Sequence, residues 1–289
     1  MMNTIENEFL KIAVKPKGAE LDSLFHKKNN LEYLWEGDPK FWGRKSPALF
    51  PFVGALREGK FIYGDNEYLM NKHGFARECE FELESQSPNE LHYLLCSNEE
   101  TRKSYPFEFE FRISYSLQRN ALHVTYDVRN TGEEEMFFSV GAHPAFRVPL
   151  AEGTAYDDYY IEFEEAETAK RHVLNGDGLI ESSEDFLVNS TRIPLSKELF
   201  YRDALVFKQI HSGMVTLRSH KTERGVNVYF DGFNFLGIWA AKDADFVCIE
   251  PWCGIADSVT HSMKLEKKEG IHALKPGKSF TVVWSAECF

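Results

Sequence analysis

Strict alternation of apolar and polar residues is the feature that most limits what this chain can fold into. Residues 107–117, FEFEFRISYSL, carry Phe, Ile, Tyr or Leu at every odd position and a polar or charged residue at every even one. Successive side chains of a β-strand point to opposite faces, so a period of two predicts a strand with one buried face. Residues 121–130, ALHVTYDVRN, repeat the pattern after a short polar turn. Together the two segments predict a long antiparallel hairpin.

Further strands are predicted along most of the chain, and helical periodicity is nearly absent. A Gly-Asp-Asn turn divides residues 60–70 into a second hairpin, and only residues 196–207 favour one short helical turn. The polar stretch from about 150 to 195 is interpreted as a loop-like, insertion-rich region. Aromatic residues make up 14% of the chain, and so many half-buried strands must pack sheet against sheet to bury them. We therefore predict an all-β fold, a large antiparallel β-sandwich formed as a single domain by residues 1–289.

Composition excludes several classes of partner. The net charge is −12, whereas nucleic-acid binding requires clustered Lys and Arg. No apolar run approaches the roughly 20 residues of a membrane span, and the N-terminus lacks the pattern of a signal peptide. The five cysteines are an odd number without repeated spacing, which indicates reduced thiols, no structural metal site and a cytoplasmic location.

One carboxylate stands in an unusual place. The apolar run FVCIE, residues 246–250, ends in Glu250 and is followed by Pro251 and Trp252. An unpaired charge in a buried strand costs several kcal/mol or shifts its pKa. Two interpretations stay open at this point: the strand ends in solvent at Glu250, or the carboxylate belongs to a site.

Two histidines occur in comparable settings. His143 lies in SVGAHPAF and His73 in NKHGFAR, and each alone fits a structural role at a strand end better than a functional one. Like Glu250, however, each falls where an apolar strand meets Gly or Pro. A carboxylate that faces an imidazole in a cleft forms a general base and general acid pair. The neighbouring rings of Phe75 and Trp252 suit the apolar faces of a sugar, so both are candidate substrate contacts.

Five motifs resemble those of a known family. SPALFPFVG, KHGFAR, YPFEFEFRISYSL, SVGAHPAF and CIEPWCGIAD occur in the order and spacing of the aldose 1-epimerase, or galactose mutarotase-like, family. The resemblance is strongest to its bacterial LacX-like branch and extends from about residue 8 to 287. It implies a large antiparallel β-sandwich, in agreement with the pattern of strands.

The resemblance also implies an acid–base isomerase that uses no cofactor or metal. Glu250 matches the base of the family, His143 matches its acid, and His73 matches its other histidine. Asp203, in LFYRDALVF, is similar to the substrate-binding aspartate. Arg77 resembles a position where related hexose-phosphate epimerases place a cation. The partner so implied is an aldohexose or its phosphate, and a homodimer stays open.

One position departs from the pattern of the family. Relatives commonly carry an arginine directly after the glycine of FP-x-x-G, and this chain has Ala55 there. Arg57, two residues later, is a candidate substitute, and Arg44 and Lys45 are others. A solvent-facing arginine beside Glu58 explains Arg57 at least as well.

The implied reaction makes a prediction about charge. Ionised Glu250 would take the proton of the anomeric hydroxyl while protonated His143 donates one to the ring oxygen. We therefore expect the neighbouring carboxylate to raise the pKa of His143. Three alternatives remain: a hexose-6-phosphate 1-epimerase that uses Arg77 with Arg44 or Lys45, a non-catalytic sugar-binding or regulatory protein, and a cysteine hydrolase that uses Cys253.

Overall fold

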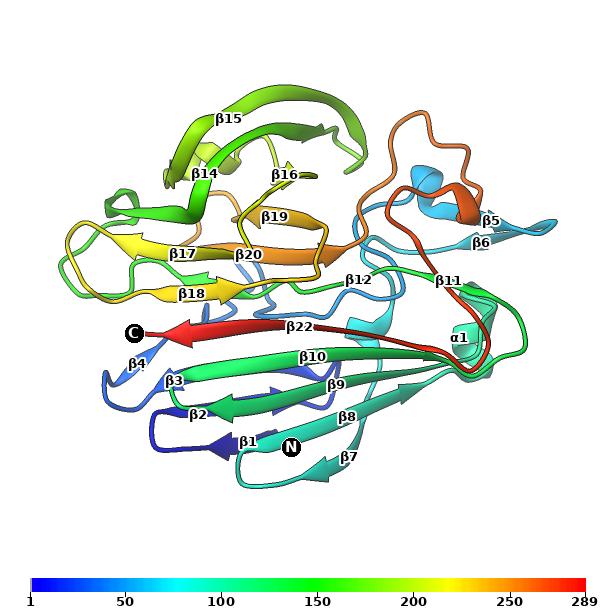
Figure 1. The fold of residues 1–289 in the computed structure, drawn as a ribbon, viewed down its shortest axis with the longest axis horizontal. Coiled ribbons are helices and arrows are strands. Elements are labelled where there is room, and N and C mark those ends of the chain that lie inside the picture. Colours follow the sequence, from blue (N-terminus) through cyan, green and yellow to red (C-terminus); the bar gives the residue numbers. More distant parts are fainter. Residues whose placement is uncertain (1) are drawn as a thin grey trace.

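A computed structural model describes residues 2–289, and strands dominate it (Figure 1). Fourteen strands form one large sheet. In chain order they are β7 (Glu82–Gln86), β8 (Glu90–Cys96), β9 (Phe109–Gln118), β10 (Ala121–Asn130), β12 (Val140–Gly141), β13 (Ala145–Arg147), β14 (Tyr159–Leu174), β15 (Ile180–Pro194), β16 (Leu205–Phe207), β17 (Met214–Ser219), β18 (Val226–Tyr229), β19 (Phe235–Trp239), β20 (Phe246–Cys253) and β22 (Ser279–Cys288).

The remaining elements are small. A four-stranded sheet contains β1 (Asn3–Glu6), β2 (Leu10–Lys15), β3 (Glu20–His26) and β4 (Leu31–Glu32). Two pairs of strands are β5 (Lys60–Tyr63) with β6 (Asn66–Leu69) and β11 (Met136–Phe138) with β21 (His272–Leu274). The α-helix α1 is Glu99–Ser104, and the 3₁₀ turns are η1 (Arg57–Gly59), η2 (Ala76–Glu78), η3 (Tyr156–Asp158), η4 (Lys197–Phe200) and η5 (Leu265–Lys267). Within residues 2–289, no helix has the length and hydrophobicity needed to cross a membrane.

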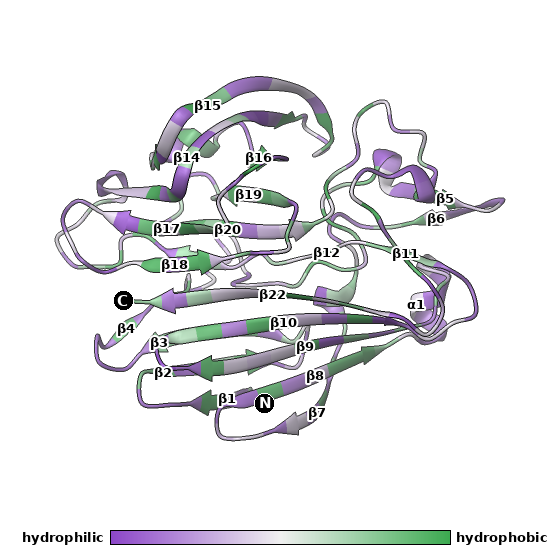
Figure 2. Cartoon of the chain, in the orientation of Figure 1, coloured by the Kyte–Doolittle hydropathy of each residue, from purple (hydrophilic) through white to green (hydrophobic). Residues whose placement is uncertain are grey.

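The hairpin predicted from alternation is confirmed. β9 and β10 pair in antiparallel register from Gln118 opposite Ala121, and every second residue of each strand is buried. The same switching between hydrophobic and hydrophilic residues is visible along these strands in Figure 2. On their buried face, Tyr115 Oη donates a 2.6 Å hydrogen bond to the carbonyl of Ala19, in the turn directly before β3 of the four-stranded sheet. The predicted antiparallel β-sandwich is therefore correct, as is the helical turn, which is η4.

The interpretation of residues 150–195 as loop-like is wrong. This region forms the hairpin β14–β15, whose strands have 16 and 15 residues. Most of β15 is at least partly exposed and four register shifts interrupt the pairing, so the sequence shows no clean period of two. Figure 1 shows this hairpin curving over β16 and β19, and its tip, residues 175–179, reaches the cavity described below.

Candidate active site

Glu250 does not reach solvent. All eight residues of β20 are buried, and Glu250 is only 1% exposed. β19 pairs with one edge of β20, while the short strands β12 and β13 pair with the other. The apolar run is therefore an interior strand of the sheet, and the alternative of a strand that ends in solvent is wrong.

The pairing of β20 also determines where His143 lies. Gly141 is opposite Trp252 and Ala145 is opposite Cys248, so the same register places residue 143 opposite residue 250. Between β12 and β13 the amide of Ala142 donates to the carbonyl of Pro251 at 2.9 Å and the amide of Ile249 donates to the carbonyl of Pro144 at 3.3 Å, so the register continues across His143. Side chains of directly opposed residues lie on the same face of an antiparallel pair, so the imidazole and the carboxylate meet although they are 107 residues apart in the chain.

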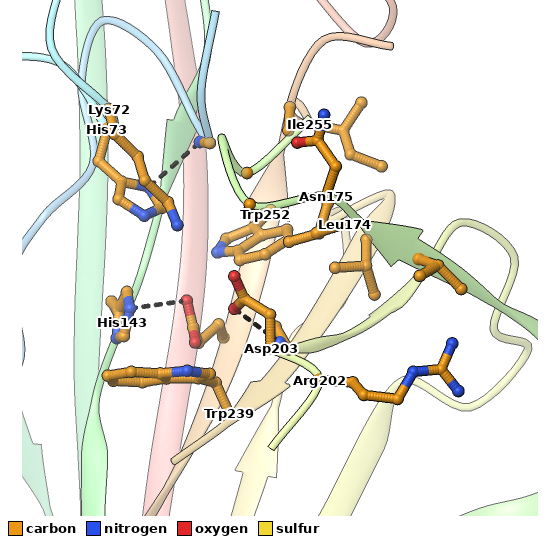
Figure 3. A pocket seen from close by; sticks show the side chains of 18 of the residues that line it. Lys72, His73, His143, Leu174, Asn175, Arg202, Asp203, Trp239, Trp252 and Ile255 are labelled. Atoms are coloured by element: carbon orange, nitrogen blue, oxygen red, sulfur yellow. Dashed lines mark hydrogen bonds and ion pairs between the residues drawn. The ribbon is translucent and has the colours of Figure 1, made fainter. Parts of the chain in front are cut away.

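The two side chains are in contact. His143 Nε2 lies 3.1 Å from Glu250 Oε2, and both groups are buried (Figure 3). The imidazole stacks on the ring of Trp42 at a centroid distance of 4.9 Å and meets Trp239 edge to face at 5.7 Å. The two indoles fix the plane of the imidazole against the carboxylate.

Burial controls the charge of this pair. Burial, together with the nearby cations Arg77, Lys72 and Arg44, lowers the pKa of His143 to about 3. Burial raises the pKa of Glu250 well above its usual range, an effect that nearby Lys72 opposes. The expected rise in the pKa of His143 is therefore wrong, because desolvation outweighs the attraction of the carboxylate. Burial therefore favours a carboxylic acid that faces a neutral imidazole, and this pair holds as many protons as a carboxylate that faces an imidazolium.

His73 is held close to this pair by its backbone. Its amide donates to the carbonyl of Gly54 at 2.9 Å, and the amide of Gly54 donates back to His73 Nδ1 at 3.1 Å. Because a backbone amide can only donate, Nδ1 is the acceptor and Nε2 carries the proton of the neutral ring. Burial lowers the pKa of His73 well below its usual range. The rings of His73 and His143 meet edge to face at 5.7 Å.

These side chains line a cavity of about 870 Å³, which is large enough for a sugar. The cavity brings together six of the eight predicted site residues. They are His73, Arg77, His143, Asp203, Glu250 and Trp252.

Asp203 enters the cavity from the segment between η4 and β16 (Figure 3). Its carboxylate accepts a 2.7 Å hydrogen bond from the amide of Ala204. Trp252 Nε1 is buried and has no hydrogen-bond partner among residues 2–289. The cavity therefore offers a ligand both an acceptor and an indole donor.

Two predicted contacts lie elsewhere. Phe75 packs into the aromatic core against Phe50 and Tyr105, and it does not line the cavity. The guanidinium of Arg57 donates to the carbonyl of His261 at 2.8 Å, also outside the cavity wall. Phe75 and Arg57 therefore do not lie with the six predicted residues that line the cavity.

The other candidate cations are already paired. Arg44 contacts the carboxylates of Glu78 and Glu20, and Lys45 Nζ lies 3.3 Å from Asp22 Oδ2. Neither lines the cavity.

Sequence reasoning missed Lys72. Its side chain is directed into the cavity beside His73 (Figure 3), and within the described residues its ammonium has neither a hydrogen bond nor an ion pair. A Cβ atom added to Gly178 would lie 3.4 Å from both Lys72 Nζ and the methyl group of Ala55. Lys72 thus places a cation near Ala55, the position at which the family pattern predicts an arginine. Its place directly before His73 was the only available signal, and a polar neighbour of a histidine is too common to be informative.

Trp42, Trp239, Asn175 and Arg202 also line the cavity and were not predicted. They come from loops and strand ends that are distant in the chain, so no local pattern marks them.

The buried group His143, Cys248 and Glu250 could offer metal ligands, since their donor atoms lie within 4.8 Å of one another. Burial raises the pKa values of both the Cys248 thiol and the Glu250 carboxyl well above their usual ranges, which favours the protonated forms over the anions that ligate metals. The donor set therefore suits proton transfer better than a divalent ion. Cys253 lies outside the cavity wall, and its thiol donates to the carbonyl of Gly232 at 3.5 Å, which gives no support to a cysteine nucleophile.

Comparison with known proteins identifies the family of this chain. The family model described as aldose 1-epimerase matches residues 1–286. LacX from Lactococcus lactis subsp. lactis, in its plasmid form, is 35% identical over 282 residues, which cover 94% of each chain. A galactose mutarotase related enzyme from Lactobacillus acidophilus has a similar structure, with a TM-score of 0.96, 37% identity and coverage of 100% of this chain and 97% of its own.

A galactose mutarotase-like protein from Lactobacillus casei ATCC 334 is also similar in structure, with a TM-score of 0.94, 30% identity and full coverage of both chains. The chain therefore belongs to the aldose 1-epimerase family, a family of carbohydrate isomerases.

Proposed function

We propose that this protein is an aldose 1-epimerase that interconverts the α and β anomers of a free aldohexose. The observation that supports this most strongly is the 3.1 Å contact between His143 Nε2 and Glu250 Oε2 in the wall of a cavity large enough for a sugar. A pyranose carries its anomeric hydroxyl O1 and its ring oxygen O5 on one carbon, C1. Two proton-transfer groups that lie this close together can reach both oxygens.

The reaction begins from the ionic form of the pair. One proton passes from Glu250 to His143 when the sugar enters, which leaves the total number of protons on the pair unchanged. Glu250 then takes the proton of O1, and His143 donates its proton to O5 as the C1–O5 bond breaks. The electrons of the O1–H bond form the aldehyde C=O bond, while those of the C1–O5 bond become a lone pair on O5. Rotation about C1–C2 and reversal of both transfers give the other anomer.

Four further residues hold the sugar in this scheme. His73 donates its Nε2 proton to a hydroxyl oxygen, and Asp203 accepts a hydroxyl proton. Trp252 packs against the apolar face of the ring. Lys72 supplies the cation that contacts the hydroxyl groups beside Ala55, since its ammonium has no partner among residues 2–289.

The test is polarimetry or NMR exchange with D-galactose, D-glucose and other free aldoses. Glu250→Gln and His143→Asn each lose nearly all of the catalysed rate, because one general acid or base typically contributes about 10²–10⁴-fold. The matched control is His123→Asn, since His123 lies on β10, contacts Ser285 at 2.7 Å and does not line the cavity. A Glu250→Gln variant with the wild-type rate would contradict the assignment.

A hexose-6-phosphate 1-epimerase is the second candidate. Arg77 and Lys72 both line the cavity and offer two cations to a phosphate, although Arg77 also lies 3.9 Å from Glu78, whereas Arg44 and Lys45 do not line it. Competition between glucose 6-phosphate and glucose in one polarimetric assay separates the two activities. A phosphate substrate shows the higher kcat/KM and loses that advantage in Arg77→Met.

A non-catalytic sugar-binding role is the outcome if a hexose binds tightly and its anomers exchange no faster than in buffer. We place the protein in the cytoplasm, where the five cysteines, all free in the structure, stay reduced. The matched family model spans nearly the whole chain, which supports one domain over residues 1–289. A homodimer is not required, because every residue of this scheme belongs to one chain.

A further inference from the structure

A buried arginine lies directly behind Asp203. Arg171 belongs to β14 and is only 4% exposed. The two protons of its Nη2 atom are shared among three successive carbonyls, those of Arg202 at 2.7 Å, Asp203 at 3.2 Å and Ala204 at 3.4 Å. A charged guanidinium is rarely buried without such compensation, so this convergence on one turn indicates a specific task.

The turn that Arg171 contacts has an unusual backbone. Asp203 has a φ of +65°, in the left-handed region that residues with a side chain seldom adopt. Its carboxylate bonds to the amide of the next residue, so the orientation of this carboxylate follows the backbone of the turn. Non-glycine residues keep such a conformation only where the surrounding structure enforces it. The three hydrogen bonds of Arg171 provide that constraint, since they connect the turn to β14.

The remaining contacts of this cluster are weaker and more exposed. Arg171 Nη1 lies 3.8 Å from Glu184 Oε1, and Arg202 Nη2 lies 3.4 Å from Glu184 Oε2. Glu184 is partly exposed, and Arg202 extends away from Asp203 in Figure 3. The buried Nη2 of Arg171 is therefore the group best placed to hold the turn.

We propose that Arg171 is a positioning residue, which fixes the turn at Arg202–Ala204 so that the carboxylate of Asp203 stays directed at the bound sugar. The proposal rests on the proposed function, in which Asp203 binds a sugar hydroxyl. Arg171 acts through Asp203 and does not line the cavity. Loss of Arg171 should therefore weaken sugar binding without removing the proton-transfer groups on β20 and beside it.

The test is a double-mutant cycle on KM and kcat with D-galactose and D-glucose as probes. R171M raises KM roughly tenfold or more and lowers kcat less than KM rises, as expected when a binding group is misplaced. R171K keeps the buried charge and recovers part of the loss. In the D203N background R171M adds less than about twofold, because the group that it positions is already altered.

The matched control is R192M, which removes an arginine from the same hairpin. Arg192 lies on β15, pairs with Glu162 at 2.7 Å and does not line the cavity, so KM stays at the wild-type value. The proposal is overturned if R171M leaves KM unchanged, or if it has the same effect in the wild-type and D203N backgrounds. If R171M does not fold, the double-mutant cycle is measured with R171K instead, and the same two outcomes would overturn the proposal.

Failure of the proposed epimerase function can be distinguished from failure of the proposed role of Arg171. A wild-type chain that does not accelerate mutarotation ends the epimerase assignment, whereas the same cycle measured as a Kd by NMR titration of either sugar still tests Arg171. A chain that neither binds nor converts these sugars contradicts both proposals.

Discussion

His143 lies opposite Glu250 in the register of the large sheet, with His143 Nε2 3.1 Å from Glu250 Oε2. The contact exists because β12 and β13 pair with the same edge of β20 in one register, which places residue 143 opposite residue 250. The two groups proposed as general acid and general base are thus held by strand pairing, and no mobile loop is needed to bring them together.

We expect a bell-shaped dependence of kcat/KM on pH, in which both limbs report the coupled titration of His143 and Glu250. The active form holds one shared proton, so kcat/KM falls at low pH when His143 also becomes protonated and at high pH when that shared proton is lost. Lys72 lowers the pKa of Glu250 and Asp203 raises it. Lys72→Met therefore moves the alkaline limb to higher pH, and Asp203→Asn moves it to lower pH. Shifts of both variants in the same direction would contradict this electrostatic arrangement.

Because of the buried carboxyl of Glu250, the folding stability of the protein should fall as the pH rises. Its pKa is raised in the folded chain, so the unfolded chain ionises first and folding stability falls between the usual pKa and the raised one, by up to about 1.4 kcal/mol per pH unit. Glu250→Gln removes this loss. Urea unfolding over a pH series should show a variant whose advantage over wild type grows with pH, and a constant difference would count against a raised pKa.

The position of the Trp252 indole requires a glycine in the neighbouring strand β19. Gly237 is opposite Glu250 in β19, and a Cβ atom added there would lie 2.6 Å from the indole of Trp252. Gly237→Ala should displace the indole, raise KM for the sugar severalfold and cost about 1–3 kcal/mol of stability through overpacking. Gly43→Ala is the matched control, since its added methyl group meets only Pro39 at an ordinary 3.7 Å. Equal sugar affinity in both variants would show that the indole does not contact the substrate.

A buried ion pair supports the back of the cavity. Lys268 Nζ lies 2.8 Å from Asp257 Oδ1, and the amide of Asp257 donates to the carbonyl of Ala55 at 2.9 Å, next to Gly54, which holds His73. Lys268→Met removes the ammonium from Asp257 Oδ1 and from the carbonyl of Ile255, while Asp257 Oδ2 keeps the amide of Arg57, and should cost up to about 3–5 kcal/mol. Thermal and urea unfolding measure this loss.

Lys267→Met is the control for that variant, because Lys267 is exposed and makes no ion pair among residues 2–289. A similar small loss in both variants would show that the pair at Lys268 contributes little to stability.

Much of the fold could be predicted because alternation is a local property. The hairpin of β9 and β10 and the sandwich follow from residues that bury every second side chain. The long hairpin β14–β15 escaped prediction because exposed strands with register shifts need not alternate. The site was predicted only in part. His73, His143 and Glu250 were found from breaks in strands and from family motifs, whereas Lys72 and Arg171 carry no local signal.

The sequence by itself determined most strands, the sandwich and the residues proposed as acid and base, since these depend on side-chain period and on short motifs. Tertiary structure decided the rest. It separated the residues that line the cavity from Arg57 and Phe75, which do not, and it reversed the expected charge state of His143. The physical reason is that desolvation and contact depend on what packs around a side chain from distant parts of the chain, and no local pattern of residues records that.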